Sequence, residues 1–399
     1  MMVIDILLDI LLIFLSLVAP KKKGSFLMGA SRGDQFIGNP AYFYRYLLDA
    51  NHQNTYWITG CKELFASMES DGYPVLYKYS FKAFTWILRS EFLVIEQMPR
   101  DILYFGLSSI GCFNYVQTFH GIALKKIGLD AAREGKGIAG FNLFKIKIFD
   151  RFANMLKRDF KKYFLYRPYK YIIATSQMTA DICKSAFGSK RVHILGYPRN
   201  DIFYQSYPIP LKVLDLTKNY RKVFTYVPTF RDNYTMVRPF SDKFYAQIEK
   251  EFKKRNWLLA IKKHPYDKNI VVPRNLEYIK DCSDIVVDLQ PLLLVTDVLI
   301  TDYSSVTNDF CLTGRPVIFY TYDVEEYRNR CRSLYLEPDE AYSGPFALDE
   351  DALGKLALSV ERWSKEKKFK EQYKEMVNRL NTYKDGNSSE RLLRFLQDR

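Results

Sequence analysis

The stretch LITDYSSVTNDFCLTGRPVIFY, residues 299–320, gives the clearest indication of the fold. It opens with a β-branched apolar run, turns at 302–305, continues with apolar residues at helical spacing, and closes with a second apolar run at 316–320. This order predicts a strand, a helix and a second strand, which together form the βαβ unit of a parallel sheet.

Two serines, Ser304 and Ser305, fall where the helix of this unit is predicted to begin. Free backbone N–H groups and the helix dipole at such a position favour an anion such as phosphate. The hydroxyls could instead cap the helix, and an isolated pair of serines at a turn favours capping. Both uses stay open on the strength of this stretch alone.

The same alternation of strand and helix extends over most of the chain, which predicts an α/β fold with doubly wound parallel sheets. Because 399 residues exceed one typical core, two domains are expected. A polar passage at 204–220 separates them, which gives an apolar helix over 1–24, a first domain over 25–210 and a second over 211–399 with C-terminal helices. The predicted strands are 25–29, 55–59, 92–95, 115–119, 171–175 and 192–195, then 223–227, 257–261, 285–287, 298–301 and 317–320; the clearest helices are 42–50 and 177–187.

Charge and cysteine content indicate the class of partner and the compartment of the protein. The formal net charge of +14 suggests an anionic partner, which composition alone leaves as nucleic acid, an acidic membrane surface or a phosphorylated substrate. The six cysteines are scattered without C-x-x-C pairs or histidines at ligand spacing, so we expect reduced thiols of a cytosolic protein.

Two segments favour a membrane surface. Residues 1–19 are almost wholly apolar, but Asp5 and Asp9 lie inside the run and three lysines follow it, the reverse of a signal peptide. An interfacial helix on the cytoplasmic leaflet is expected, with a helix packed on the protein's own core as the alternative. A basic, aromatic insert at 121–170 is equally typical of a surface-lying membrane helix and of an ordinary amphipathic helix, and the N-terminal run favours the former.

Two of the four histidines directly follow predicted strands. In open α/β sheets ligands bind beyond the carboxyl ends of strands, so His120 and His264 are each placed to reach a crevice. A facing pair from two domains would suit proton transfer near neutral pH. His52 and His193 lack such a position and are interpreted as structural.

Further polar groups follow other strands, although each is weak when taken singly. The sequence VPTFRD at 227–232 offers Thr229 and then Arg231, a hydroxyl and a guanidinium that could hold a diphosphate. No P-loop, G-x-S-x-G elbow or G-x-G-x-x-G fingerprint is present, which disfavours kinases, hydrolases and dehydrogenases.

Five motifs, in order HGIALKKIG, GYPRND, VPTFRD, KKHP and ITDYSSVTNDF…RPVIFY, give a pattern that resembles the CDP-glycerol glycerophosphotransferase family, the teichoic acid primases and polymerases. The resemblance extends over most of the chain. It implies a GT-B fold, two Rossmann-like doubly wound domains facing across a cleft, with the donor CDP-glycerol bound by the second.

The resemblance also implies a reaction. An acceptor hydroxyl attacks the β-phosphorus of CDP-glycerol, CMP leaves, and a phosphodiester forms. His120 is then the general base, and His264 with Arg231 and Thr229 stabilises the diphosphate. The remaining implied binding residues are Gly121, Lys125, Asp232, Asp302, Ser304 and Ser305. No cofactor is firmly implied, no metal ligands are assigned, and dependence on a divalent metal stays open. One departure is HGIALK where relatives commonly have HGTPLK, so a side-chain role at Ile122 is doubtful.

The implied acceptor is linked to a polyprenyl diphosphate, which puts the enzyme on the anionic cytoplasmic face of the membrane, without a nucleic-acid partner and with oligomerisation possible. The short chain favours a primase over a polymerase. Three alternatives stay open: a ribitol-phosphate transferase that uses CDP-ribitol, a GT-B glycosyltransferase that uses a nucleotide sugar, and a non-catalytic membrane-binding protein.

Overall fold

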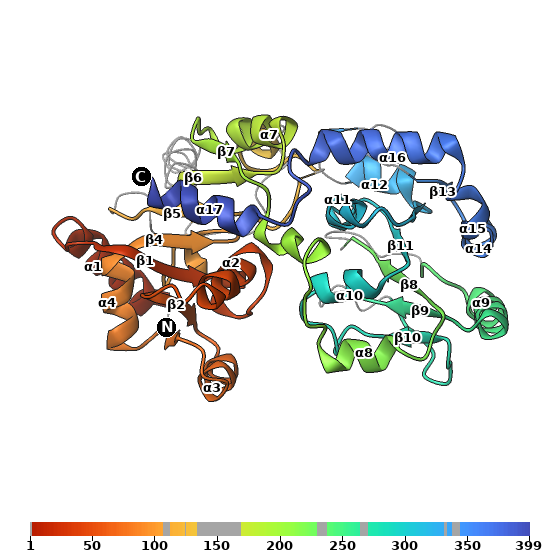
Figure 1. The fold of residues 1–399 in the computed structure, drawn as a ribbon, viewed down its shortest axis with the longest axis horizontal. Coiled ribbons are helices and arrows are strands. Elements are labelled where there is room, and N and C mark those ends of the chain that lie inside the picture. The colour runs from red at the N-terminus through yellow and green to blue at the C-terminus, as the bar shows by residue number, and fades with distance from the viewer. Residues whose placement is uncertain are drawn as a thin grey trace, which may run out of the picture. The chain divides into compact units, whose positions relative to one another are not determined.

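The computed structural model describes residues 2–106, 112–123, 125–133, 169–229, 238–263, 270–330, 333–336 and 344–399. The chain folds into two compact units, shown in Figure 1. The first unit comprises Met1–His120, Ile127–Asp201 and Asp385–Arg399, and the second comprises Gly121–Lys126 and Ile202–Lys384. Each unit is described by itself below.

The first unit is built on a parallel sheet of order β3-β2-β1-β4-β5-β6-β7. Every strand predicted for this part of the chain is present, and β3 is additional because three residues are too short a run to stand out in the sequence. The strands are β1 (Lys22–Gly29), β2 (Thr55–Thr59), β3 (Val75–Tyr77), β4 (Ser90–Ile95), β5 (Tyr115–Gln117), β6 (Tyr169–Ala174) and β7 (Val192–Ile194).

The order of this sheet reverses at β1, since β2 and β3 lie on one side of β1 and β4 to β7 on the other. In open α/β sheets the crevice at such a reversal, outside the carboxyl ends of the strands, is where ligands bind. Two short 3-10 turns border it: η1 (Ser31–Gly33) follows β1 and η2 (Pro99–Asp101) follows β4.

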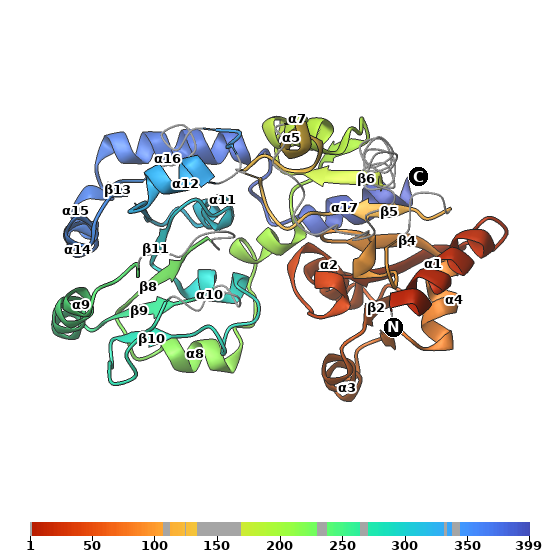
Figure 2. The same ribbon diagram turned by 180° about the vertical axis from the view of Figure 1, so that it is seen from behind.

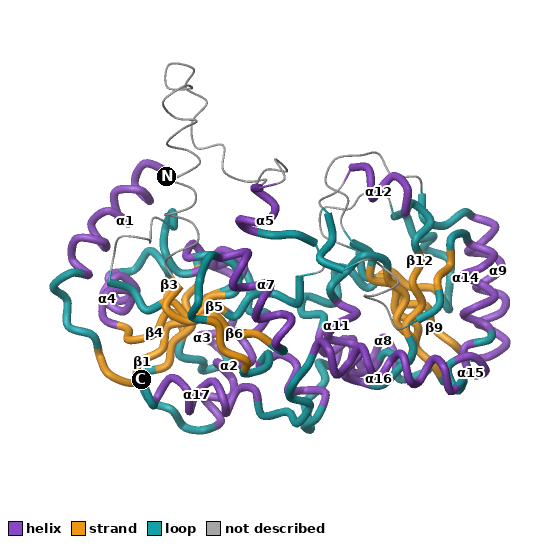
Figure 3. Tube along the Cα trace, turned by 90° about the horizontal axis from the view of Figure 1, so that it is seen from above, coloured by secondary structure: helices purple, strands orange, loops and turns teal. Residues whose placement is uncertain are grey.

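Helices cover both faces of this sheet (Figure 2). They are α1 (Met2–Ser16), α2 (Gly38–Asp49), α3 (Lys62–Ser70), α4 (Phe81–Arg89), α5 (Gly128–Arg133), α7 (Gln177–Phe187) and α17 (Ser388–Gln397). α17 packs beside α2, as Figure 3 shows from above. The prediction that all of 211–399 belongs to the second domain is therefore wrong for the last fifteen residues.

Polar and aromatic contacts hold α17 to the first unit. The buried carboxylate of Asp201 accepts the backbone N–H groups of Ser388 and Ser389 at 2.9 and 2.8 Å. The Phe395 ring lies 5.2 Å from Tyr171 and 4.3 Å from His193. The sequence could not show this return of the chain, because these partners lie about two hundred residues upstream.

The second unit contains a parallel sheet of order β10-β9-β8-β11-β12-β13. The predicted unit at 299–320 is present as β11, the short helix α11 and β12, with Ile300 paired to Ile318. The strands are β8 (Lys222–Val227), β9 (Trp257–Ile261), β10 (Ile279–Asp281), β11 (Val298–Thr301), β12 (Val317–Tyr320) and β13 (Phe346–Ala347). The helices are α8 (Leu211–Thr217), α9 (Asp242–Arg255), α10 (Gln290–Val295), α11 (Val306–Phe310), α12 (Val324–Arg330), α14 (Glu350–Leu358), α15 (Val360–Trp363) and α16 (Lys367–Leu380), and the 3-10 turn η4 (Pro198–Phe203) precedes them.

One predicted strand of this unit, 285–287, is wrong. Val286 is buried, but Ile285 and Val287 are 39% and 64% exposed, and the residues after them turn into α10 with the Asp288 carboxylate accepting the Gln290 N–H. The strand that pairs with β9 at the edge of the sheet is β10. It has only three residues, and Lys280 and Asp281 interrupt the apolar pattern expected of a buried strand.

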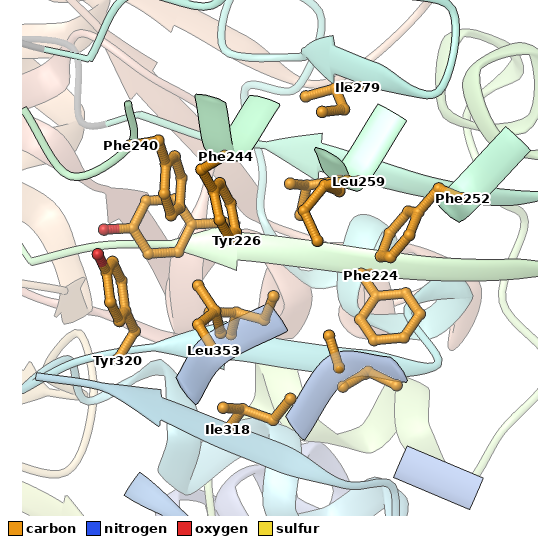
Figure 4. Packing of buried hydrophobic residues seen from close by; sticks show 14 of the residues in the cluster. Phe224, Tyr226, Phe240, Phe244, Phe252, Leu259, Ile279, Ile318, Tyr320 and Leu353 are labelled. Carbon is orange, nitrogen blue, oxygen red and sulfur yellow. The ribbon is translucent and has the colours of Figure 1, made fainter. Parts of the chain in front are cut away.

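Aromatic side chains fill the core between this sheet and the helices α9 and α14 (Figure 4). The rings of Phe240 and Tyr320 stack at 5.6 Å, and Phe240 also stacks on Phe244 at 4.9 Å. The Tyr320 hydroxyl donates to the Pro239 carbonyl at 2.7 Å. Truncating one such ring to alanine costs about 3–5 kcal/mol, so this core fixes the strand ends that carry the site.

The helix α1 turns its polar side inward. The Asp9 carboxylate accepts the backbone N–H groups of Tyr104, Phe105 and Gly106, and the Ser16 hydroxyl accepts that of Cys112. Apolar side chains face outward instead, namely Met2, Val3, Ile4, Leu7, Leu11 and Phe14, followed by Leu17 and Val18 after the helix. Among the described residues, no helix has the length and apolar character needed to cross a bilayer.

The lysines after α1 are partly committed to the first unit. The Lys21 ammonium donates to the Leu88 carbonyl at 2.7 Å, and burial lowers its pKa to about 8. The Lys22 ammonium lies 5.0 Å from the centre of the Trp86 ring. Lys22 and Lys23 are exposed, whereas Lys21 is half-buried.

Candidate functional site

The order of the second sheet reverses between β8 and β11, and the residues that follow these two strands are bonded to each other. Asp302, which is fully buried, accepts the backbone N–H of Thr229 with both carboxylate oxygens, at 2.9 and 3.1 Å. It also accepts the Thr229 hydroxyl at 2.6 Å. The structure thus brings together two residues that the sequence placed in the donor pocket from different motifs.

This pairing defines what each group can do. The Asp302 carboxylate is closed to solvent and joins the residue after β11 to the loop after β8. The Thr229 hydroxyl gives its proton to Asp302, which leaves only its lone pairs for other partners.

Ser304 and Ser305 lie at the start of α11 and are half-buried. The Ser304 hydroxyl oxygen is 3.4 Å from the backbone nitrogen of Val306, a weak contact. Ser305 occupies the N-cap position, but its hydroxyl caps no backbone N–H. Capping therefore does not account for the pair, and the Ser305 hydroxyl is available to another acceptor.

The HGIALKK motif packs against the same helix. The buried amide of Asn308 on α11 donates to the Ile122 carbonyl at 3.2 Å, and the Ile122 side chain is buried. Gly121 has a φ of 147°, a conformation that L side chains rarely adopt. Because an apolar contact fills the position where relatives commonly have threonine, this chain replaces a hydroxyl there by core packing.

Lys125 lies in this cluster as well. Its ammonium is 4.8 Å from the centre of the Tyr327 ring, which stacks on Tyr303 at 3.7 Å. Tyr303 directly precedes Ser304 in the chain. A cation is thus held over an aromatic pair next to the serine turn, a position suited to an anionic ligand.

His120 is the last residue of the first unit before the chain enters the second, and its side chain is exposed. The Arg199 guanidinium of the GYPRND motif donates to the His120 carbonyl at 2.8 Å. The Asn39 amide donates to the carbonyls of Thr118 and Phe119 at 3.1 and 2.7 Å and accepts the Arg199 N–H at 3.1 Å. These bonds fix the backbone that carries the imidazole.

The sequence interpretation missed Asn39 and left Arg199 without a role. Arg199 belongs to GYPRND, one of the five motifs of the resemblance, so the sequence marked this residue without giving it a chemical role. The expectation that His52 and His193 are structural agrees with their contacts, since His52 meets Thr55 at 3.1 Å and His193 packs on Phe395.

Several predicted residues lie outside the part of the chain that the structure describes: Arg231, Asp232, His264 and most of the insert 121–170. The KKHP motif is described as far as Lys263, whose ammonium pairs with the Asp281 carboxylate at 2.5 Å. Within the described ranges, no group of three or more histidine, cysteine, aspartate or glutamate residues could hold a metal ion.

Comparison with known proteins places these features in context. The model of the family described as CDP-glycerol:poly(glycerophosphate) glycerophosphotransferase matches residues 11–398. A teichoic acid glycerol-phosphate transferase of Staphylococcus aureus is 27% identical over 372 residues, which cover 90% of this chain and 89% of that protein. A teichoic acid glycerol-phosphate primase of Bacillus spizizenii is 34% identical over 259 residues, 61% of each chain.

A solved structure of the wall teichoic acid polymerase TagF shares the fold. It superimposes with a TM-score of 0.74 at 19% identity, covering 99% of this chain and 98% of that one. The predicted α/β class, with two Rossmann-like units of the GT-B type, is confirmed.

Proposed function

This chain belongs to the CDP-glycerol glycerophosphotransferase family and uses CDP-glycerol as its donor, and we propose that it transfers the glycerol phosphate of this donor to a hydroxyl of a lipid-linked sugar or of a growing polyol-phosphate chain. The family match over residues 11–398 carries this proposal. The cluster of Thr229, Asp302, Ser305 and Lys125 in the second unit supports it, because hydroxyl and ammonium groups there suit a diphosphate.

The transfer needs a base, a grip on the phosphoryl oxygens and a stabilised leaving group. In the proposed mechanism His120 takes the proton of the acceptor hydroxyl while that oxygen attacks the β-phosphorus of CDP-glycerol. The bond from the β-phosphorus to the bridging oxygen breaks, and CMP leaves with the bond's electron pair. Asn39 and Arg199 hold the backbone at His120, so they orient the base without touching the substrate.

We propose that residues of the second unit bind the phosphates of the donor. Ser304 and Ser305 present hydroxyls to the phosphates, and Lys125 supplies a positive charge nearby. Arg231 and His264 are proposed to stabilise the charge that develops on CMP, with Asp302 holding the loop that leads to Arg231. No step of this mechanism requires a metal ion.

Nucleotide release tests the proposed donor. Purified protein is incubated with CDP-glycerol, CDP-ribitol or a UDP-sugar, together with a lipid-linked sugar acceptor. We expect acceptor-dependent release of CMP from CDP-glycerol. Release of UDP alone would contradict the proposal and favour a glycosyltransferase. Preferred use of CDP-ribitol would instead show transfer of ribitol phosphate.

Histidine variants test the proposed chemistry. His120→Ala and His264→Ala are each expected to lower kcat by about 100-fold or more, the range of general acid–base catalysis. His52→Asn is the matched control, because His52 contacts Thr55 and packs on Phe26 and has no role in the proposed mechanism. Wild-type rates in both site variants would remove the mechanism, whereas thermal unfolding at an unchanged temperature excludes misfolding as the cause.

We assign the acceptor to the first unit, and we propose that this unit contacts the cytoplasmic face of the membrane through α1. Both aspartates of this helix point inward, and its outward side chains are apolar. Exposed Lys23, Lys82 and Arg89 on β1 and the neighbouring α4 give this surface a basic rim. An apolar face with a basic rim suits the surface of an anionic bilayer, into which such helices insert only partway.

Vesicle flotation tests this contact. The variant Leu7→Gln/Leu11→Gln/Phe14→Gln is expected to lose flotation with phosphatidylglycerol–phosphatidylcholine vesicles and to keep its unfolding temperature, because the changed side chains are exposed. Asp9 is left intact, since its loss would leave three N–H groups without their acceptor. Undiminished flotation would show that α1 is not the membrane contact.

A further inference from the structure

Two arginines that the proposed mechanism does not use lie at the carboxyl edge of the first unit's sheet. Arg32 lies on η1 after β1, and Arg100 lies on η2 after β4, the two strands at which the order of the sheet reverses. Both side chains are exposed, and neither guanidinium has a carboxylate or hydrogen-bond partner among the described residues.

A buried lysine joins the backbone at these two arginines. Lys78, only 3% exposed, follows β3, and its ammonium donates to the Arg100 carbonyl at 2.9 Å and the Arg32 carbonyl at 3.5 Å. The two backbone segments therefore lie on either side of one nitrogen. A buried ammonium is costly unless it is paired, so its use here fixes η1 and η2 against each other.

A buried aspartate joins the same two turns from the other side. The Asp101 carboxylate, fully buried, accepts the Arg32 N–H at 2.8 Å and those of Glu96, Gln97 and Met98 at 3.0, 2.7 and 3.2 Å. A side chain at Gly29 would collide with the Asp101 carbonyl, which shows how closely η2 approaches β1.

The backbone at Arg32 is also strained. Ser31 and Arg32 have φ values of 50° and 61°, in the left-handed region that costs a non-glycine residue free energy. The buried charges of Asp101 and Lys78 hold the Arg32 backbone in this conformation. Its guanidinium is exposed at the carboxyl edge of the sheet. A fork of N–H donors in such a position matches phosphate oxygens.

We propose that Arg32 and Arg100 bind the phosphate groups of the acceptor substrate, and that Lys78 and Asp101 position them. The inference rests on the proposed function, because it assigns the first unit to the acceptor. Two sources share this chemistry, the diphosphate of a lipid-linked sugar and the phosphodiesters of a growing chain. The α1 helix is fastened to residues 104–106, directly after η2, so the arginines and the outward apolar face are carried by connected backbone.

Acceptor kinetics test the pair. The double variant Arg32→Ala/Arg100→Ala is compared with wild type on three acceptors: an alkyl-diphosphate-linked sugar, a short glycerol-phosphate oligomer and an alkyl glycoside without phosphate. We expect the KM of at least one phosphate-bearing acceptor to rise by about 10-fold or more, since each lost charge-assisted bond weakens binding by about that factor. The acceptor that responds identifies the source. The KM values for CDP-glycerol and for the glycoside should stay unchanged.

Two further variants complete the test. Arg191→Ala, an exposed arginine directly before β7, is the matched control and should change none of these values. Arg32→Lys/Arg100→Lys should recover part of the affinity because it keeps the charge. An unchanged KM for both phosphate-bearing acceptors, or an equal rise for the glycoside, would overturn the proposal.

Direct binding separates this proposal from the proposed function. The alkyl-diphosphate-linked sugar is titrated into wild type and the double variant by calorimetry, with CDP-glycerol absent. Weaker binding to the double variant supports the arginine site even if no transfer occurs. Equal binding overturns it even if transfer from CDP-glycerol is observed.

Discussion

The carboxyl edges of the two sheets are constructed differently. In the second unit the Asp302 carboxylate accepts the N–H and the hydroxyl of Thr229, so it joins the residues that follow β11 and β8. In the first unit Asp101 binds N–H groups from two separate turns, and Lys78 binds a carbonyl of each. A buried carboxylate thus joins two strand ends at the edge proposed for the donor, whereas a buried carboxylate and a buried ammonium join two turns at the edge proposed for the acceptor. The comparison teaches that similar sheets can anchor their binding loops through very different polar networks.

Breaking the contact in the second unit should have the largest effect. Asp302→Ala leaves the Thr229 N–H without its acceptor and frees the loop that leads to Arg231. We expect kcat/KM for CDP-glycerol to fall by about 100-fold or more, measured as CMP release. Asp302→Asn, which keeps one acceptor oxygen, should lose less. Equal activity of both variants and wild type would show that this contact does not position the donor site.

Loosening the backbone at His120 should have a smaller effect. Asn39→Ala removes the donor to the Thr118 and Phe119 carbonyls. We expect kcat to fall by about 10-fold with both KM values unchanged, because the base loses orientation while the substrates still bind. Asn39→Asp keeps the acceptor for the Arg199 N–H but not the donor, and should behave like alanine. Wild-type kcat in Asn39→Asp would contradict this role.

Removing the lysine of the first unit should act mainly on stability. Lys78→Met leaves the carbonyls of Arg32 and Arg100 without their donor, at a cost of about 1–3 kcal/mol in the free energy of unfolding. The KM for a phosphate-bearing acceptor should rise by a few-fold, since the arginines lose their fixed spacing, while the KM for CDP-glycerol stays constant. Denaturant unfolding and acceptor kinetics measure the two effects. A raised KM for CDP-glycerol alone would contradict the division between the units.

The smallest effect concerns pH. Burial lowers the pKa of Lys78 to about 8, opposed by Asp101, Asp9 and Asp34 and assisted by Arg100, and burial lowers the pKa of Lys21 to about 8. Between pH 8 and the ordinary lysine value of 10.5, the unfolded chain binds more protons than the folded one, so stability should rise with pH in this window. Denaturant midpoints across pH 8–10 measure it. Lys78→Met should show a shallower rise, and an equal slope would contradict this assignment.

The sequence predicted the second edge better than the first, and the reason is physical. At 299–320 the strands, turn and helix are contiguous, so the pattern of apolar residues reveals them and places Asp302 and Ser305 at a strand end. It could not reveal that Asp302 is closed to solvent and binds Thr229, because that contact joins residues 73 positions apart.

The first edge has no comparable local pattern. Lys78 follows a three-residue strand, and its partners Arg32 and Arg100 lie 46 and 22 positions away. Asn39 reaches the backbone before His120 across about 80 positions. In each case the polar group looks like an ordinary surface residue until the sheet order is known. The packing of residues 385–399 in the first unit could not be predicted for the same reason.

Hydrogen–deuterium exchange of the wild-type protein tests the division of roles most directly. The amides of 301–306 and 227–229 are followed with CDP-glycerol, and those of 31–33 and 99–101 with the alkyl-diphosphate-linked sugar. The account predicts that CDP-glycerol slows exchange at the first set and the acceptor analogue slows it at the second. Protection of 31–33 and 99–101 by CDP-glycerol, with no change at 301–306, would contradict it.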